Sequence, residues 1–204
     1  MVHYGFAITN SKVSNKSQII HPELENSNTF KIGTIGRLVP GKNYFTMLSS
    51  IGLILEKIPE MKFFIVGTGK SGTELKKLCK QMQIDSNVIW LGKTAHVQEF
   101  LRKLDLFIFA SHGEGFGLAL LEAMQANKPI LAPNNSAIPE VLGVGYPGLY
   151  PTGDYKLLAD KILYVNNESR SVNELTSGFK SQLKLFDSEI MADRIIQVYE
   201  SIGF

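Results

Sequence analysis

The chain of 204 residues has one cysteine, one tryptophan and no long apolar segment. The single cysteine, Cys79, excludes an internal disulfide and a metal cluster held by several thiolates, and it is typical of the reducing cytosol. No apolar run approaches the roughly 20 residues of a membrane-spanning helix, and no basic region followed by an apolar stretch opens the chain. We therefore expect a cytoplasmic protein whose membrane contact is at most peripheral.

A marked excess of charge is also lacking. The chain has 21 Lys and Arg against 19 Asp and Glu, a net charge of +2, with no long basic run. Nothing electrostatic therefore indicates a nucleic-acid partner. The four histidines show no metal-ligand spacing, and no Asp-x-Asp pair occurs to hold a divalent cation. We expect no metal and no other cofactor.

The composition, 44% hydrophobic and 20% charged, suits one globular domain. Residues 7–28 are polar and rich in Asn and Ser, so we assign residues 1–28 to a hinge or linker and residues 29–204 to the folded domain. Near 154–166, 171–185 and 188–201 the pattern predicts three further helices, of which the last has an apolar face.

From residue 29 onward, short apolar runs alternate with segments of helical periodicity. This pattern predicts an α/β fold with a doubly wound parallel sheet of Rossmann-like type, in which ligands bind at the carboxyl ends of the strands. The expected strands are TFKIGTIG, MKFFIVG, NVIWLG, LDLFIFA and KPILAP. The expected helices are NYFTMLSSIGLILEKIPE, SGTELKKLCKQMQI, TAHVQEFLRKL and GFGLALLEAMQA.

Two of the loops that follow strands carry glycines or cations. In GRLVPGKN, Gly36 lets a ligand approach the backbone, while Arg37 and Lys42 place two cations at one strand end, a combination that suits a pyrophosphate. The loop GTGKSG, which begins at Gly67, lacks the full G-x-G-x-x-G spacing. An ordinary strand-to-helix turn explains that loop equally well.

The stretch SHGEGFGLALLEAMQANKP combines a glycine loop with two carboxylates. We expect a helix from about Phe116 or Gly117, whose free N–H groups would form an anion site. Glu114 lies in the loop, and Glu122 follows eight residues later, about 2.2 turns of helix, so both could face one ligand.

The position of Glu122 in an otherwise apolar helix needs an explanation, because burying an unpaired carboxylate is costly. One alternative is a core salt bridge with Arg37 or Lys42. The other is that its oxygens accept hydrogen bonds from ligand hydroxyls, as a ribose diol would offer. For His112 we expect local hydrogen bonds, and for Trp90 packing in the core.

Taken together, the motifs resemble the family 4 glycosyltransferases, a GT-B group of retaining enzymes that use nucleotide-sugar donors. The resemblance covers nearly the whole chain and includes the Glu-x7-Glu motif of Glu114 and Glu122. The segments that carry it are IGRLVPGKN, FIVGTGKSGTELKKL, VIWLGK, LDLFIFASHGEGFGLALLEAMQANKPILAPNNSAIPEVLG and GLYPTGDYKLLADKI.

The resemblance implies roles for these residues. Arg37 and Lys42 would neutralise the donor diphosphate, Glu114 would contact the transferred sugar, and these three are the candidate catalytic residues. Glu122 would bind the ribose hydroxyls. The remaining donor-binding candidates comprise backbone positions that cradle sugar and phosphate and a loop against the base: Gly36, Gly67, Lys93, Thr94, Gly115, Phe116, Gly117 and Leu118.

The resemblance further implies a C-terminal donor domain that lacks its N-terminal acceptor domain and needs one in cis or in trans. The donor would be a UDP-, GDP- or ADP-sugar bound without metal, and surface polysaccharide or glycolipid assembly is a common setting. Two alternatives stay open. One is a non-catalytic nucleotide-binding or partner-docking module, and the other is a GT-B epimerase or phosphorylase.

Overall fold

A sheet of six strands organises the chain, and the computed structural model describes it over residues 21–202. The strand order is β3-β2-β1-β4-β5-β6, and every neighbouring pair is parallel. The register places Lys31 opposite Lys62 and Ile32 opposite Leu106. The strands are β1 (Lys31–Ile35), β2 (Lys62–Val66), β3 (Val88–Gly92), β4 (Leu106–Ile108), β5 (Ile130–Pro133) and β6 (Leu149–Tyr150).

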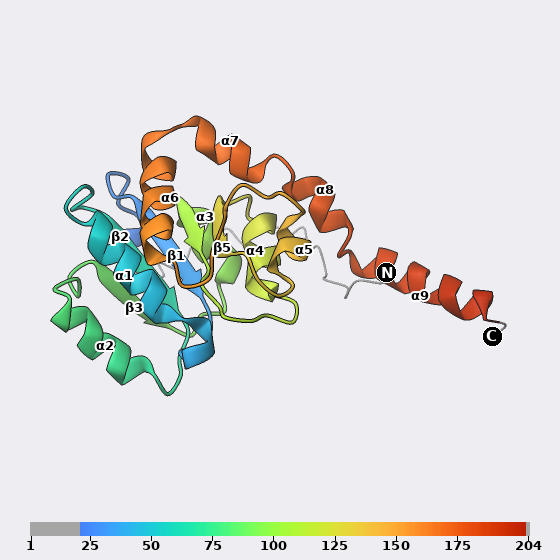
Figure 1. Cartoon of the computed structure of the whole chain (residues 1–204), viewed down its shortest axis with the longest axis horizontal. Coiled ribbons are helices and arrows are strands. Elements are labelled where there is room, and N and C mark those ends of the chain that lie inside the picture. Colours follow the sequence, from blue (N-terminus) through green and yellow to red (C-terminus); the bar gives the residue numbers. More distant parts are fainter. Residues whose placement is uncertain (1–20, 203–204) are drawn as a thin grey trace.

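Helices cover both faces of the sheet (Figure 1). One face packs on α1 (Tyr44–Ile54), α2 (Gly72–Gln81), α6 (Tyr155–Asn167) and α7 (Arg170–Thr176). The other packs on α3 (Val97–Lys103), α4 (Leu118–Gln125), α5 (Ile138–Leu142) and α8 (Phe179–Lys184). Two 3-10 turns, η1 (Pro22–Leu24) and η2 (Pro40–Lys42), and the helix α9 (Ser188–Ser201) complete the elements.

The strands are continuous apolar runs because both of their faces are buried. In β2, Phe63 and Ile65 enter the core under α1, whereas Phe64 and Val66 enter the core under α4. All four side chains are at most 4% exposed. This two-sided burial confirms the prediction of a doubly wound parallel sheet.

Some boundaries differ from the expectation. The helix predicted over 171–185 is two helices, α7 and α8, separated at Gly178, and α4 begins one residue later than expected, at Leu118. β6 has two residues and α5 has five, too short for a periodic pattern to reveal them. Trp90, which we expected in the core, is half-buried at the surface of β3.

The two ends of the described chain differ in their packing. The predicted linker lies mostly outside the described residues, but Leu24 of η1 is 3% exposed and belongs to the core under α4. Packing against the sheet therefore begins before residue 29. At the other end, α9 extends away from the layers (Figure 1), with Ile196 and Ile202 more than half exposed.

Candidate functional site

The strand order reverses between β1 and β4, and the loops that follow these two strands lie against each other. β1 and β4 are neighbours in the sheet, yet the chain leaves β1 toward α1 on one face and β4 toward α4 on the other. In open parallel sheets, ligands bind at this point, outside the carboxyl ends of the strands. The two loops hold Gly36 to Lys42 and Ser111 to Gly117, which include most of the predicted site residues.

Lys42 and Glu114 meet where these two loops face each other. The Lys42 ammonium donates a hydrogen bond to Oε1 of Glu114, although the residues are 72 positions apart in sequence. Their side chains are 21% and 15% exposed, so the pair is largely removed from water. The Lys42 Nζ also lies 5.3 Å from the centroid of the Phe109 ring, a cation–π contact. The structure thus joins two predicted site residues and holds the cation from two sides.

Ser111 connects the backbones on both sides of this ion pair. Its side chain is buried, and its hydroxyl lies 3.1 Å from the carbonyl oxygen of Gly41 and 3.2 Å from that of Gly113. The His112 N–H donates to the same Gly41 oxygen at 2.9 Å. Since Gly41 precedes Lys42 and Gly113 precedes Glu114, Ser111 positions the two charged residues relative to each other.

The loops after β5 and β6 join the same network. The Asn135 side-chain amide donates to the Ser111 carbonyl oxygen at 3.2 Å and to the Thr152 hydroxyl at 2.6 Å. The Ala137 N–H approaches the Glu114 carbonyl oxygen at 3.4 Å. Four strand ends therefore contribute to one polar layer.

The helix α4 starts beside the ion pair. Gly117 has a φ of 76°, in the left-handed region, and no side chain caps the helix. The first N–H groups of α4 thus lack a side-chain partner and suit an anion. Leu118 is 55% exposed at this helix start, and the Phe116 ring packs edge-to-face on Phe186 with centroids 5.7 Å apart.

Glu122 lies in the second turn of α4 and is half-buried. Burial raises the pKa of this carboxyl above its ordinary value. Within residues 21–202, Glu122 forms no salt bridge with Arg37 or Lys42, because Lys42 pairs with Glu114 instead. The salt-bridge explanation is therefore wrong for this state, and the carboxyl oxygens retain capacity for further donors.

The other predicted residues occupy the same edge of the sheet with fewer contacts. Arg37 and Lys93 are exposed. The Thr94 hydroxyl accepts a hydrogen bond from the His96 N–H at 3.0 Å and thereby stabilises the turn before α3. The Gly36 carbonyl oxygen accepts from the Tyr44 hydroxyl at 3.0 Å.

Gly67 is explained by backbone packing. Its φ is 142°, and a Cβ built on it would lie 1.8 Å from the Gly36 carbonyl oxygen. No side chain fits there, because the loops after β1 and β2 cross at this point, where Gly36 N–H also donates to the Val66 carbonyl at 3.0 Å. An ordinary strand-to-helix turn therefore explains why position 67 is a glycine.

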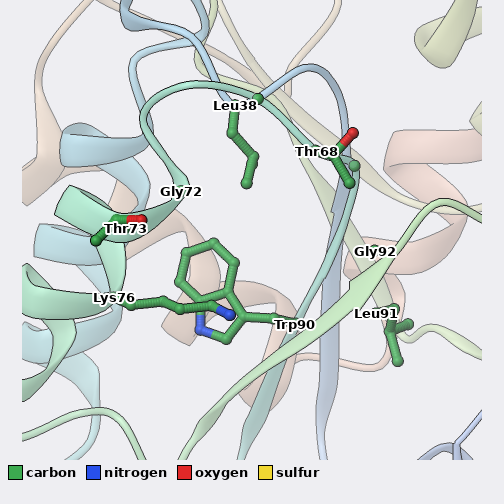
Figure 2. A pocket seen from close by; sticks show the side chains of 10 residues that line it. Leu38, Thr68, Gly72, Thr73, Lys76, Trp90, Leu91 and Gly92 are labelled. Carbon is green, nitrogen blue, oxygen red and sulfur yellow. The ribbon is translucent and has the colours of Figure 1, made fainter.

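A pocket of about 440 Å³ lies next to the point where the loops after β1 and β2 cross (Figure 2). Leu38, Gly72 and Thr73 line one side of it, and the Trp90 indole lies opposite. The Lys76 Nζ is 5.7 Å from the Trp90 ring centroid, so this lysine of the solvated α2 face covers the half-buried ring. Trp90 is partly buried and packs against the core under α1, and the Lys76 side chain covers its ring at the sheet edge.

Over residues 21–202, no group of three or more His, Cys, Asp or Glu side chains could hold a metal ion. In the same range, no helix combines the length and apolar character needed to cross a bilayer. Cys79 is a buried thiol whose pKa burial raises to about 11, which makes it unreactive.

The residues that sequence reasoning missed are Phe109, Ser111, Asn135 and Thr152. Ser111 and Asn135 follow the predicted strands LDLFIFA and KPILAP, so position after a strand was an available signal for both. Phe109 lies inside the first of these strands and Thr152 follows no predicted strand, so neither had such a signal.

Known proteins resemble this chain in sequence. Residues 15–181 match the family described as glycosyl transferases, group 1. N-acetyl-alpha-D-glucosaminyl L-malate synthase of Bacillus anthracis is 30% identical over 146 residues, which are 71% of this chain and 38% of that protein. The capsular polysaccharide biosynthesis glycosyltransferase CapM of Staphylococcus aureus is 25% identical over 97% of this chain and 54% of its own length. The chain thus spans about half or less of these relatives.

Solved structures share the fold. Anabaena Alr3699/HepE in complex with UDP-glucose superposes with a TM-score of 0.82 at 22% identity, over 98% of this chain and 57% of that one. The C-terminal domain of a group 1 glycosyl transferase (LpcC) of Francisella tularensis gives a TM-score of 0.66 at 26% identity, over 76% of this chain and 83% of that one. With the family match covering most of its length, this chain belongs to the group 1 glycosyltransferases.

Proposed function

We propose that this chain is the donor-binding part of a retaining glycosyltransferase of family 4, which transfers a sugar from a nucleoside-diphosphate sugar to an acceptor hydroxyl. The observation that carries the proposal is the meeting of Lys42, Glu114 and the start of α4 where the loops after β1 and β4 come together. A cation and free helix N–H groups suit the diphosphate. The structural relative crystallised with UDP-glucose supports a uridine nucleotide.

Each charged residue has a proposed task. Lys42 and Arg37 bind the diphosphate, and Lys42 exchanges Glu114 for a phosphate oxygen when the donor arrives. Glu114 then turns to the sugar. Glu122 accepts hydrogen bonds from the ribose hydroxyls, which offsets the cost of its burial. Lys93 and Thr94 lie against the base.

The proposed chemistry needs no metal. The bond between the sugar C1 and the phosphate oxygen breaks, and its electron pair stays on the diphosphate. The acceptor oxygen forms a new bond to C1 on the same face, and its proton passes to the departing phosphate oxygen. Lys42, Arg37 and the amides of α4 stabilise the charge that develops on the leaving group.

An acceptor-binding domain is part of the proposal. The relatives are about twice as long as this chain or longer, and we propose that the acceptor domain acts in cis or in trans with the described fold. The proposed setting is cytoplasmic, with surface polysaccharide or glycolipid as product, as the similarity to CapM supports.

Calorimetric titration with UDP, GDP and ADP in the presence of EDTA tests the donor site. We expect one nucleotide, UDP, to bind without metal, and Glu122→Ala to weaken it. The matched control is Glu60→Ala, an exposed glutamate just before β2 at the opposite edge of the sheet. If no nucleotide binds to the folded protein at millimolar concentration, the proposal is wrong.

The second candidate is a non-catalytic partner-docking module. The observation that favours it is the exposed apolar surface of α9, where Ile196, Val198 and Ile202 are 53%, 49% and 62% exposed. A docking module of this kind needs no nucleotide. The calorimetric titration therefore distinguishes the two candidates, because only the donor-binding part of a transferase should bind UDP.

A further inference from the structure

The loop at residues 113–117, between β4 and α4, carries one side chain in its second half. Phe116 is the only residue with a side chain between Glu114 and Leu118, because both of its neighbours are glycines. A Cβ on Gly115 would meet no described atom within 4 Å, so the loop faces open space there. Side-chain packing therefore anchors this part of the loop at the Phe116 ring.

The Phe116 ring rests on Phe186, two residues beyond the end of α8. The two rings meet edge-to-face, with centroids 5.7 Å apart and planes at 62°, an arrangement that aromatic pairs prefer. Phe186 is 1% exposed and belongs to the core under α4, whereas Phe116 is partly buried at the edge of that core. The buried ring of Phe186 thus holds the more exposed ring of Phe116.

Phe186 is itself held by the corner between α8 and α9 (residues 185–187). The Phe186 N–H donates to the Leu183 carbonyl oxygen at 3.0 Å. The helix α8 is tied to α5, because the Gln182 side-chain amide donates to the Glu140 carbonyl oxygen at 2.7 Å. The corner is thus fixed to the folded layers, and α9 leaves them directly after it (Figure 1).

We propose that Phe186 is a positioning residue for nucleotide binding, because its ring sets, through Phe116, the loop that leads to the free N–H groups of α4. This inference rests on the proposed function. A loop that already has its bound shape loses less conformational entropy when a ligand binds. Without the Phe186 ring, Phe116 and residues 113–117 can adopt more conformations, so the diphosphate must order the loop as it binds. Because Phe186 is buried, it acts through Phe116 and does not touch the nucleotide.

The experiment measures UDP affinity by calorimetric titration of the wild type, Phe186→Leu and a matched control, Phe179→Leu. Phe179, the first residue of α8, is 2% exposed and stacks on Tyr146 with the same centroid distance of 5.7 Å. The Tyr146 hydroxyl bonds the Ile130 backbone at the start of β5, so this pair lies at the opposite edge of the sheet. We expect Phe186→Leu to weaken UDP binding about two- to tenfold and Phe179→Leu to leave it unchanged.

A double-mutant cycle tests whether Phe186 acts through Phe116. In the Phe116→Leu background, Phe186→Leu should cause no further loss of UDP affinity, because the ring contact is already gone. Additive losses would show that Phe186 acts by another route, and the inference would be wrong. Equal losses in Phe186→Leu and Phe179→Leu would overturn it as well, since damage to the core alone then explains both.

Thermal unfolding shows whether each variant folds, and two further variants decide the question if Phe186→Leu does not. Phe116→Leu changes a partly buried ring and should lose UDP affinity by the same factor. Phe186→Tyr keeps the ring and should bind UDP as the wild type does. If the wild type binds UDP and Phe116→Leu or Phe186→Leu binds it equally well, the inference is wrong and the proposed function stands. If the wild type binds no nucleotide, the proposed function fails and the inference with it.

Discussion

Lys42 illustrates how the surroundings of a single residue suit it to the proposed diphosphate. The ammonium is shielded from water, paired with Glu114 and placed over the Phe109 ring, so it loses little freedom when it exchanges one anionic partner for another. Glu122 is in the opposite situation, since its carboxyl is partly buried and forms no salt bridge with the site cations. The Lys42 ammonium thus has a hydrogen-bond partner before a nucleotide binds, whereas the burial of the Glu122 carboxyl costs free energy until one binds.

Lys42→Ala should weaken UDP binding by about 1.5 to 3 kcal/mol, the usual value of a hydrogen bond to a charged group, or roughly tenfold or more. The reason is that the diphosphate loses its least solvated cation. The measurement is calorimetric titration at one salt concentration. Lys70→Ala is the control, because Lys70 is an exposed lysine on the neighbouring loop after β2. Equal losses of UDP affinity in both variants would mean that Lys42 contributes only its positive charge and no specific contact.

Glu122→Gln should raise the unfolding temperature of the ligand-free chain at pH 7. Burial raises the pKa of Glu122 in the folded state, so the folded chain binds more protons than the unfolded chain just above the unfolded value of about 4.3. The contribution of Glu122 to stability therefore falls as the pH rises through this window.

Thermal unfolding at pH 4 and pH 7 checks this sign. The difference between Glu122→Gln and wild type should be largest at pH 7 and shrink toward pH 4, where the wild-type carboxyl is also protonated. A variant that is less stable than wild type at pH 7 would mean that the carboxylate already has a stabilising partner. The exposed Glu60→Gln should show no such pH dependence.

At the scale of elements, the site depends on how the loops after strands pack on one another. The loops after β1 and β2 cross with their backbones in contact, at Gly36 and Gly67. The loops after β4, β5 and β6 meet through Ser111, Asn135 and Thr152. Hydrogen-bonded loops therefore lie on both sides of Lys42 and Glu114 and hold them in place.

Gly67→Ala should destabilise the fold by more than about 2 kcal/mol. The new Cβ would meet the Gly36 carbonyl oxygen at 1.8 Å, and a φ of 142° is strained for alanine. Gly41→Ala is the control, because a Cβ there meets nothing within 4 Å. Urea unfolding measures both variants, and a fully stable Gly67→Ala would show that the two loops can separate without cost.

At the scale of the whole molecule, the described chain has a complete core on both faces of the sheet and an apolar surface that is left over on α9. A core of this size supports independent folding. The helix α9 projects from this core (Figure 1). We therefore expect the stability of the fold to be independent of the apolar surface of α9.

Replacing Ile196, Val198 and Ile202 together by serine should therefore leave the unfolding temperature within about 6 °C of wild type, since exposed substitutions each change stability by at most ~0.5 kcal/mol. Binding of a fluorescent hydrophobic dye should fall. Ile162→Ser, a fully buried change on α6, is the contrast and should lower the unfolding temperature strongly. A large loss of stability in the triple variant would mean that α9 is part of the core.

Sequence alone determined the fold class and the edge of the sheet where the site lies. Apolar runs that alternate with helical periodicity permit few topologies, and right-handed crossovers place every strand-to-helix loop at one edge. For this reason Lys42, Glu114 and Glu122 could be named as candidates before their positions were known. Short elements such as β6 escaped prediction because two residues carry no periodic signal.

Only the tertiary structure decided which of these residues touch. The Lys42–Glu114 pair, the Ser111 hydroxyl between two backbones and the Asn135 NH₂ group all join segments that are distant in sequence. Such contacts depend on the strand order, which places β1 beside β4, and on side-chain packing within a few ångströms. Local sequence patterns contain neither the strand order nor the side-chain packing, because they record periodicity along the chain and not the distance between segments in the fold.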